Sequence, residues 1–336
     1  MRLLPTTYSF ARFSLPSQGR VGLVLNPPRA TWLRIFVYFG ARNYEMYRNF
    51  TDADVLTMLS ILHEFTAETS QIYNAYGNKA SGKSLAEQEK SSFLNRKSVE
   101  SAHYGGLLSM EAAADHLMVF ADSFAEPDKT VAPWTCVRAL LESYALASWF
   151  LDSTIDVKTR VGRYFAFRYI GFVQQVKLFE VQGRQQDIDK AKQRIQKVEQ
   201  DALGLGFSRV VNGKGSIDGI GQKMPHMTDL VGITLNREFE YRLLSAVAHG
   251  HHWATHQMGF QKIETTNLNG QVEKGLEKHI HPKFVLYAAN VAVTSFSQVL
   301  WDTWRLYGWN ENEIKLFLDT TYNRLNYTNE RRLWHT

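Results

Sequence analysis

The sequence is almost free of cysteine. Cys136 is the single one among 336 residues, so an intrachain disulfide is excluded. Such scarcity is usual in a reducing cytosol, and we expect a cytoplasmic protein in which Cys136 is a small buried residue. The N-terminal apolar run Trp32–Gly40 is interrupted by Arg34 and is too short to span a bilayer, so we expect no membrane partner.

Acidic residues are nearly absent from residues 1–45. This segment contains six arginines, no lysine and one acid, Glu45. Its composition resembles a transit peptide, but we favour a mis-called start, with translation beginning at Met46. We therefore divide the chain into a leader, 1–45, that is disordered or not translated, and a single domain, 46–330.

The charge of the chain is concentrated in that leader. The whole chain has a formal net charge of +5, and the six arginines and one glutamate of residues 1–45 account for all of it. The remaining residues are close to neutral, so the charge of the body does not indicate a nucleic-acid partner.

Stretches that alternate between apolar and polar residues with period two are also lacking, whereas apolar residues at three- and four-residue spacing are frequent. This pattern predicts an all-α, multi-helix bundle with long polar loops. The expected helices are 52–76, 107–124, 134–151, 157–182, 184–201, 237–258, 283–307 and 311–326. The expected polar connections are 204–233 and 261–281, together with 77–98, which is either a loop or a solvated helix.

The 77–98 connection contains the letters GNKASGKS, which match the phosphate-loop spacing. A phosphate loop follows a buried strand, but a helical pattern precedes this one. We therefore interpret the match as a surface loop.

Four of the eleven histidines lie between residues 237 and 258. On one continuous helix, Tyr241, Ser245, His249, His252 and His256 would form a single polar stripe. Three imidazoles on one side could bind Zn²⁺. However, ligands from one straight helix seldom converge, and H-E-x-x-H is missing. We therefore expect a buried, hydrogen-bonded His249 beside a polar rim of His251, His252 and His256 with no cofactor, and keep a metal at His249, His252 and His256 as an alternative.

Charged residues interrupt the most apolar stretch, 134–151. Arg138 and Glu142 are one helical turn apart there, and Arg160 and Arg163 share one side of the next helix. We expect a pocket where the helices 134–151, 157–182 and 237–258 meet. In it, Arg160, Arg163, Tyr241 and Ser245 would bind a ligand, and Arg138, Glu142 and His249 would supply acid–base chemistry.

Four motifs follow one another between residues 105 and 308. They are D-H-L at Asp115, R-x-x-x-E at Arg138 with Trp149 after it, R-x-x-R at Arg160, and Y-x-x-x-S-x-x-x-H-G at Tyr241. This order resembles that of uncharacterised bacterial all-helical proteins and, more distantly, HEPN-type domains. Many HEPN domains are RNases with an R-x4-6-H motif and pair as dimers.

The resemblance implies that Arg242 and His249, with six residues between them, cleave RNA without a metal, and that the chain can form a homodimer. Leu243 stands where a polar residue usually follows the arginine. Our interpretation is therefore a helical bundle whose Arg/Glu/His pocket binds a ligand or partner. The alternatives are the RNase and the histidine metal site.

Overall fold

The computed structural model describes residues 52–77, 79–124, 130–266, 270–279 and 282–330. All of them fall within one compact unit, Asn49–Thr336. The leader predicted for residues 1–45 lies outside the described residues.

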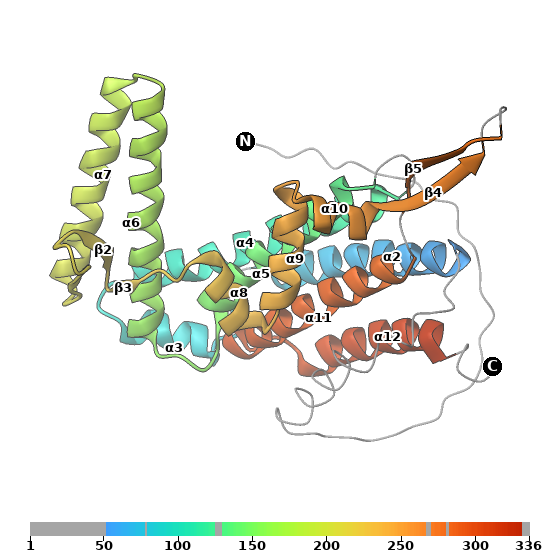
Figure 1. Ribbon diagram of the computed structural model, residues 1–336. Coiled ribbons are helices and arrows are strands. Elements are labelled where there is room, and N and C mark those ends of the chain that lie inside the picture. The colour runs from blue at the N-terminus through green and yellow to red at the C-terminus, as the bar shows by residue number, and fades with distance from the viewer. Residues whose placement is uncertain (1–51, 78, 125–129, 267–269, 280–281, 331–336) are drawn as a thin grey trace. The chain divides into compact units, whose positions relative to one another are not determined.

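Helices dominate the described residues, and the prediction of an all-α multi-helix fold is confirmed (Figure 1). The helices are α2 (Asp52–Tyr76), α3 (Leu85–Ser92), α4 (Arg96–Asp122), α5 (Ala132–Leu151), α6 (Val157–Val181), α7 (Gln185–Gly204), α8 (Met227–Leu235), α9 (Glu238–Ala248), α10 (His252–Gly259), α11 (Pro282–Tyr307) and α12 (Glu311–Glu330). The helix expected from residue 107 begins earlier, because Asn95 caps α4 by accepting a hydrogen bond from the Ser98 amide (3.1 Å).

α5 is the central helix of the bundle. It packs against α4, α8, α9 and α11, and its large side chains Trp134 and Tyr144 are fully buried. An aromatic cluster connects α2, α11 and α12: the centre of the Phe65 ring on α2 lies 5.0 Å from that of Phe296 on α11 and 5.3 Å from that of Phe317 on α12. Each buried side chain of this size contributes about 1.5–3 kcal/mol to folding.

α11 is long and apolar enough, by length and composition, to cross a membrane, and 72% of its most apolar window is buried inside the protein. Burial in the bundle accounts for that composition, since a core helix needs apolar residues on every side.

α6 and α7 lie side by side as an antiparallel pair with a core of their own (Figure 1). The buried residues of this second core are Val99, Val161, Phe165, Tyr169, Val198, Ala202, Phe207 and Ile220. They come from α4, α6, α7, the segment between α7 and β1, and β2, so this core ties the helical pair to α4. α6 begins as expected after Asp156, whose side chain accepts a hydrogen bond from the Thr159 amide (2.6 Å).

Two of the predicted loops contain strands, which corrects the expectation that none is present. β1 (Arg209–Val211), β2 (Ile217–Ile220) and β3 (Gln222–Lys223) form one antiparallel sheet. β4 (Phe260–Thr266) and β5 (Val272–Lys278) form another. The strands β1, β2 and β3 are too short to show a pattern in the sequence. The described residues of β4 and β5 are exposed or only half-buried, so their sequences carry no alternating apolar signal.

The single helix predicted for residues 237–258 is also wrong, because α9 ends at Ala248 and α10 begins at His252. Gly250 has a φ of 69°, a left-handed conformation that glycine adopts without strain. The amide of Gly250 bonds to the Val247 carbonyl (3.0 Å), and that of His251 bonds to the Ala246 carbonyl (2.9 Å). This pair of bonds is the Schellman ending of a helix.

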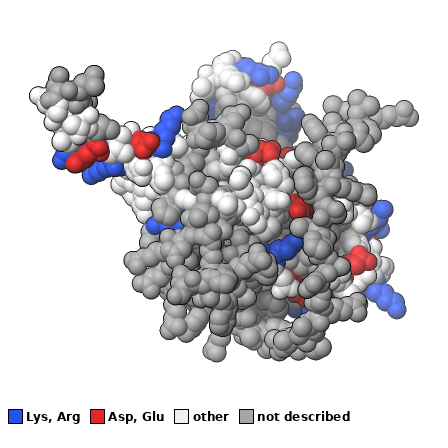
Figure 2. All heavy atoms as spheres, turned by 90° about the vertical axis from the view of Figure 1, so that its right-hand side faces the viewer, with Lys and Arg blue, Asp and Glu red and all other residues white. Residues whose placement is uncertain are grey.

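Figure 2 shows one face of the molecule. Among its described residues, lysine and arginine lie beside acidic side chains, and neither positive nor negative charge gathers into one large patch. The interspersed charges agree with the near-neutral composition of the chain after residue 45.

Candidate functional site

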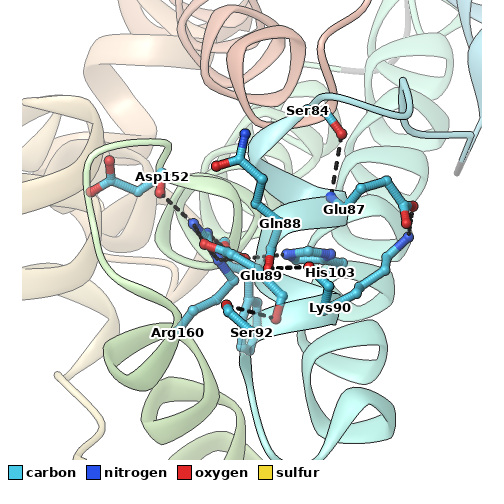
Figure 3. A network of polar contacts seen from close by, with 11 residues as sticks. Ser84, Glu87, Gln88, Glu89, Lys90, Ser92, His103, Asp152 and Arg160 are labelled. Atoms are coloured by element: carbon cyan, nitrogen blue, oxygen red, sulfur yellow. Dashed lines mark hydrogen bonds and ion pairs between the residues drawn. The ribbon is translucent and has the colours of Figure 1, made fainter.

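A buried ionic cluster joins α3, α4 and α6 (Figure 3). Glu89 on α3 accepts two hydrogen bonds from Arg160 on α6, from Nε at 2.9 Å and from Nη2 at 3.0 Å. The same carboxylate lies 2.8 Å from Nε2 of His103 on α4. Arg160 is 0% exposed and His103 is 2% exposed. Buried charges need such partners, because desolvating either one alone costs several kcal/mol.

Arg160 and Arg163 also complete the C-terminal end of α5. Arg160 donates to the carbonyl of Phe150 and, at 3.0 Å, to that of Asp152. Arg163 donates to the carbonyl of Trp149 and lies 5.4 Å from the centre of that residue's indole. Helix carbonyls at this end have no partner within the helix, and cations there also oppose the negative end of its dipole.

The charge states in the cluster follow from burial and pairing. Burial raises the pKa of Glu89, but the hydrogen bond from His103 and the charge of Arg160 outweigh it and hold that pKa below its ordinary value. Burial lowers the pKa of His103, against the opposing effect of Glu89. His103 is therefore a neutral imidazole. We assign its proton to Nε2, where the ionised Glu89 accepts it, which leaves Nδ1 as an acceptor.

A surface groove of about 400 Å³ has His103 of this cluster in its lining. It is lined by Lys90, Lys97, Glu100, Ser101, His103, Tyr104, Leu107 and Tyr307. These residues come from α3, α4 and the C-terminal end of α11. The buried Nδ1 of His103 has no hydrogen-bond partner among the described residues. Within the same residues, Lys97 pairs with no carboxylate, whereas Lys90 is held by Glu87 at 2.7 Å.

The structure brings together three of the residues expected between α5 and α9. The Tyr241 hydroxyl donates to Glu142 Oε1 (2.9 Å), and Arg138 Nε lies 3.1 Å from the same oxygen. The Arg138 guanidinium also lies 5.6 Å from the centre of the Tyr241 ring. Burial raises the pKa of Tyr241, and Glu142 adds to this effect, so the hydroxyl keeps its proton and donates.

Arg160 and Arg163 do not complete that group, because their hydrogen bonds go to Glu89 and to the end of α5. Ser245 is half-buried, and its carbonyl accepts the His249 amide at 3.0 Å. The expectation that His249 is buried is wrong: it caps the end of α9 and is exposed, and its ring lies 6.5 Å from that of His251. The expected pocket is thus divided between two clusters, and the acid–base and ligand-binding roles assigned to its residues stay predictions.

The histidine stripe is interrupted by the turn at Gly250. His249 caps the end of α9, whereas His252 and His256 belong to α10. In the described part of the chain, no three His, Cys, Asp or Glu side chains are grouped closely enough to hold a metal ion. A metal at these histidines stays a prediction.

Arg242 is exposed on α9, and its Nε lies 2.8 Å from Glu238 Oε1. This ion pair joins successive turns of one helix. RNA cleavage by Arg242 and His249 is likewise a prediction.

Glu89 and His103 were not singled out from the sequence. Glu89 lies in the polar stretch 77–98, where nothing marks it from its charged neighbours. Along the sequence, its partners His103 and Arg160 are fourteen and seventy-one residues away from Glu89. One feature of α4 could have indicated His103: it lies on the same helix face as the buried residues Val99, Gly106 and Met110, where a histidine is unusual.

The GNKASGKS loop provides a helix cap. α2 precedes it, and Ser84 accepts a hydrogen bond from the Glu87 amide (3.3 Å) at the start of α3. A helix therefore stands where a phosphate loop requires a strand.

The chain matches no family model, no curated protein and no solved structure.

Proposed function

We propose that this protein binds a small organic anion in the groove formed by α3, α4 and α11. The observation that carries the proposal is His103, a buried neutral imidazole at the groove whose Nδ1 acceptor has no partner among the described residues. An unsatisfied buried acceptor costs about 1–3 kcal/mol. Nδ1 is closed to solvent, so a ligand hydroxyl or N–H group that displaces the covering side chains to reach it would recover that free energy.

The other lining residues indicate the chemistry of the ligand. Lys97 supplies a cation that no described carboxylate neutralises, so an anionic group is favoured. Tyr104 and Tyr307 supply aromatic surface for a ring. A groove of about 400 Å³ holds one small molecule. We therefore infer a ring-containing ligand with one anionic group and a hydrogen-bond donor.

The buried cluster gives the groove a rigid wall. Glu89 connects α3 to α4 through His103 and to α6 through Arg160. Because the ring of His103 is held by Glu89, the orientation of Nδ1 is fixed before a ligand arrives. A binding group that is already positioned loses less conformational entropy on binding.

The proposal is tested by thermal denaturation in the presence of nucleoside monophosphates, sugar phosphates and aromatic carboxylates, followed by calorimetry on those that stabilise the protein. Ser101→Trp, which fills the groove, should abolish binding. Lys97→Ala should weaken it by roughly tenfold, as expected for one charge-assisted hydrogen bond. The control Lys192→Ala, at an exposed lysine of α7, should bind like the unmodified chain. Binding that survives Ser101→Trp would place the ligand elsewhere.

A further inference from the structure

β4 and β5 form a two-stranded sheet to which no other described strand is added. Their outer edges therefore have backbone groups that no described strand pairs, and an isolated two-stranded sheet is only marginally stable in water. Val272 and Leu276 on β5 are exposed as well. The hairpin has the properties of a sheet that is extended by a further strand.

We propose that β4 pairs with β4 of a second copy of this chain, antiparallel and about a two-fold axis at Ile263. This surface is independent of the proposed ligand groove. The pairing joins two hairpins into one four-stranded sheet, in the order β5, β4, and then β4 and β5 of the second copy. It is an isologous contact, the kind that closes a dimer.

The sequence of β4, FQKIETT, is self-complementary in this register. In an antiparallel pair about a two-fold axis, residues equally distant from the centre face each other. Ile263 then faces Ile263 of the second copy, and Lys262 faces Glu264 of the second copy. Symmetry repeats the Lys–Glu pair, so the centre of the contact contains two ion pairs around an apolar pair.

The residues next to β4 continue this complementarity. Glu264 already pairs with Lys274 across the hairpin at 3.3 Å. Extending the sheet gives the order Lys274, Glu264, and then Lys262 of the second copy, with charges that alternate. On the other face, Ile263 lies across from Gly275, where a Cβ would make only an ordinary contact with it, at 3.5 Å.

β5 offers no equivalent edge. A two-fold pairing centred on its middle residue, Gly275, sets Lys274 against Leu276 and Val272 against Lys278. No oppositely charged pair forms in that register. The charge pattern therefore favours β4 as the contact between two copies.

Charge reversal tests the register on the full chain by analytical ultracentrifugation. Lys262→Glu sets two carboxylates against each other at both ion pairs of the contact, and Glu264→Lys sets two ammonium groups against each other there. Each variant alone should dimerise on the order of tenfold or more weakly than the unmodified chain. In a mixed dimer of the two variants, position 262 of each chain faces position 264 of the other with the opposite charge, so both ion pairs are restored and the mixture should dimerise like the unmodified chain. The double variant, in which lysine and glutamate exchange places, restores both opposite-charge pairs and should dimerise again. Lys192→Glu on α7 is the matched control and should dimerise normally.

Cross-linking tests the position of the axis, in a Cys136→Ser background. Ile263→Cys places two thiols face to face, and oxidation should link them into a dimer. Gln261→Cys, whose opposite residue is Thr265, should cross-link far less. An unmodified chain that stays monomeric at every concentration overturns the proposal. So do a double charge variant that stays monomeric, and equal cross-linking at positions 261 and 263.

Discussion

Arg160 shows how a single side chain can hold three segments together. Its guanidinium donates to Glu89 and to the carbonyls of Phe150 and Asp152, and none of its surface is exposed. These acceptors lie on α3 and at the end of α5, so the planar donor group acts as a rigid connector. A lysine has donors too, but they radiate from one point and do not match this fork of acceptors.

Replacing Arg160 should therefore be severe. Arg160→Met leaves Glu89 buried without its cation, and we expect a loss of about 3–5 kcal/mol in the free energy of unfolding. Urea denaturation measures this value. Arg96→Met, which removes an exposed pair with Glu100, is the control and should cost less than about 1 kcal/mol. Similar losses in the two variants would show that the buried cluster adds little stability.

His103 and Glu89 make the free energy of unfolding depend on pH. Both have pKa values below their ordinary ones, so each binds protons more readily in the unfolded chain. The free energy of unfolding should then fall as the pH decreases below about 6.5, the ordinary value for histidine, and fall further near 4.5, that of glutamate. Denaturation curves on each side of pH 6.5 measure the first effect.

His103→Gln keeps a donor for Glu89 and does not titrate. We expect this variant to show less change in stability across pH 6.5 than the unmodified chain. His63→Gln, at an exposed histidine, is the control and should keep the full dependence. An equal pH dependence in the His103→Gln variant would contradict the assignment of His103 as the titrating group.

At the scale of elements, adjacent glycines in α4 have opposite surroundings. A Cβ on Gly106 would lie 2.5 Å from Cγ of the buried Leu151, whereas a Cβ on Gly105 would lie 3.7 Å from the ring of Phe150. The first distance is a clash between α4 and α5, and the second is an ordinary contact. The close approach of the two helices thus depends on Gly106.

Alanine at these two positions should therefore change stability in opposite directions. Gly106→Ala forces the helices apart, and we expect a loss of about 1–3 kcal/mol. Gly105→Ala removes a flexible residue from a helix without a clash, and a gain of up to about 1 kcal/mol follows. Thermal denaturation distinguishes them. A stabilised Gly106→Ala variant would mean that Leu151 moves aside without cost.

Helical periodicity located most of the helices, because each buries an apolar stripe of ordinary spacing. It did not separate α9 from α10, because residues 237–258 fit the periodicity of one continuous helix. The break between the two helices depends on the left-handed conformation of Gly250. It also missed β4 and β5, whose described residues show no buried face to generate a pattern. Local signals therefore found the long core helices, but they missed the short helix α8, which begins in the predicted connection 204–233 although it packs against α5.

At the scale of the whole molecule, the site depends on contacts that sequence spacing does not reveal. Arg138 and Glu142 are one turn apart, so their pairing could be predicted from the helix alone. Arg160 was recognised as a functional candidate, but its partner Glu89 comes from a helix within 77–98, a stretch that the sequence marks only as polar. Only the packing of α3 against α4 makes that carboxylate and His103 neighbours.

The distribution of charge gives the last prediction. Residues 1–45 carry the entire net charge of +5, and the face in Figure 2 shows no large basic patch in its described part. Binding to RNA should therefore depend on the six arginines of the leader, with an affinity that falls steeply as salt increases. Filter binding of the full chain and of a chain starting at Met46 measures this, and the shorter chain should bind much more weakly.

Equal, salt-dependent binding by both chains would instead place an RNA site on the helical bundle. Arg242→Ala and His249→Ala would then be the first variants to assay for cleavage, because both residues are exposed on α9 or at its end.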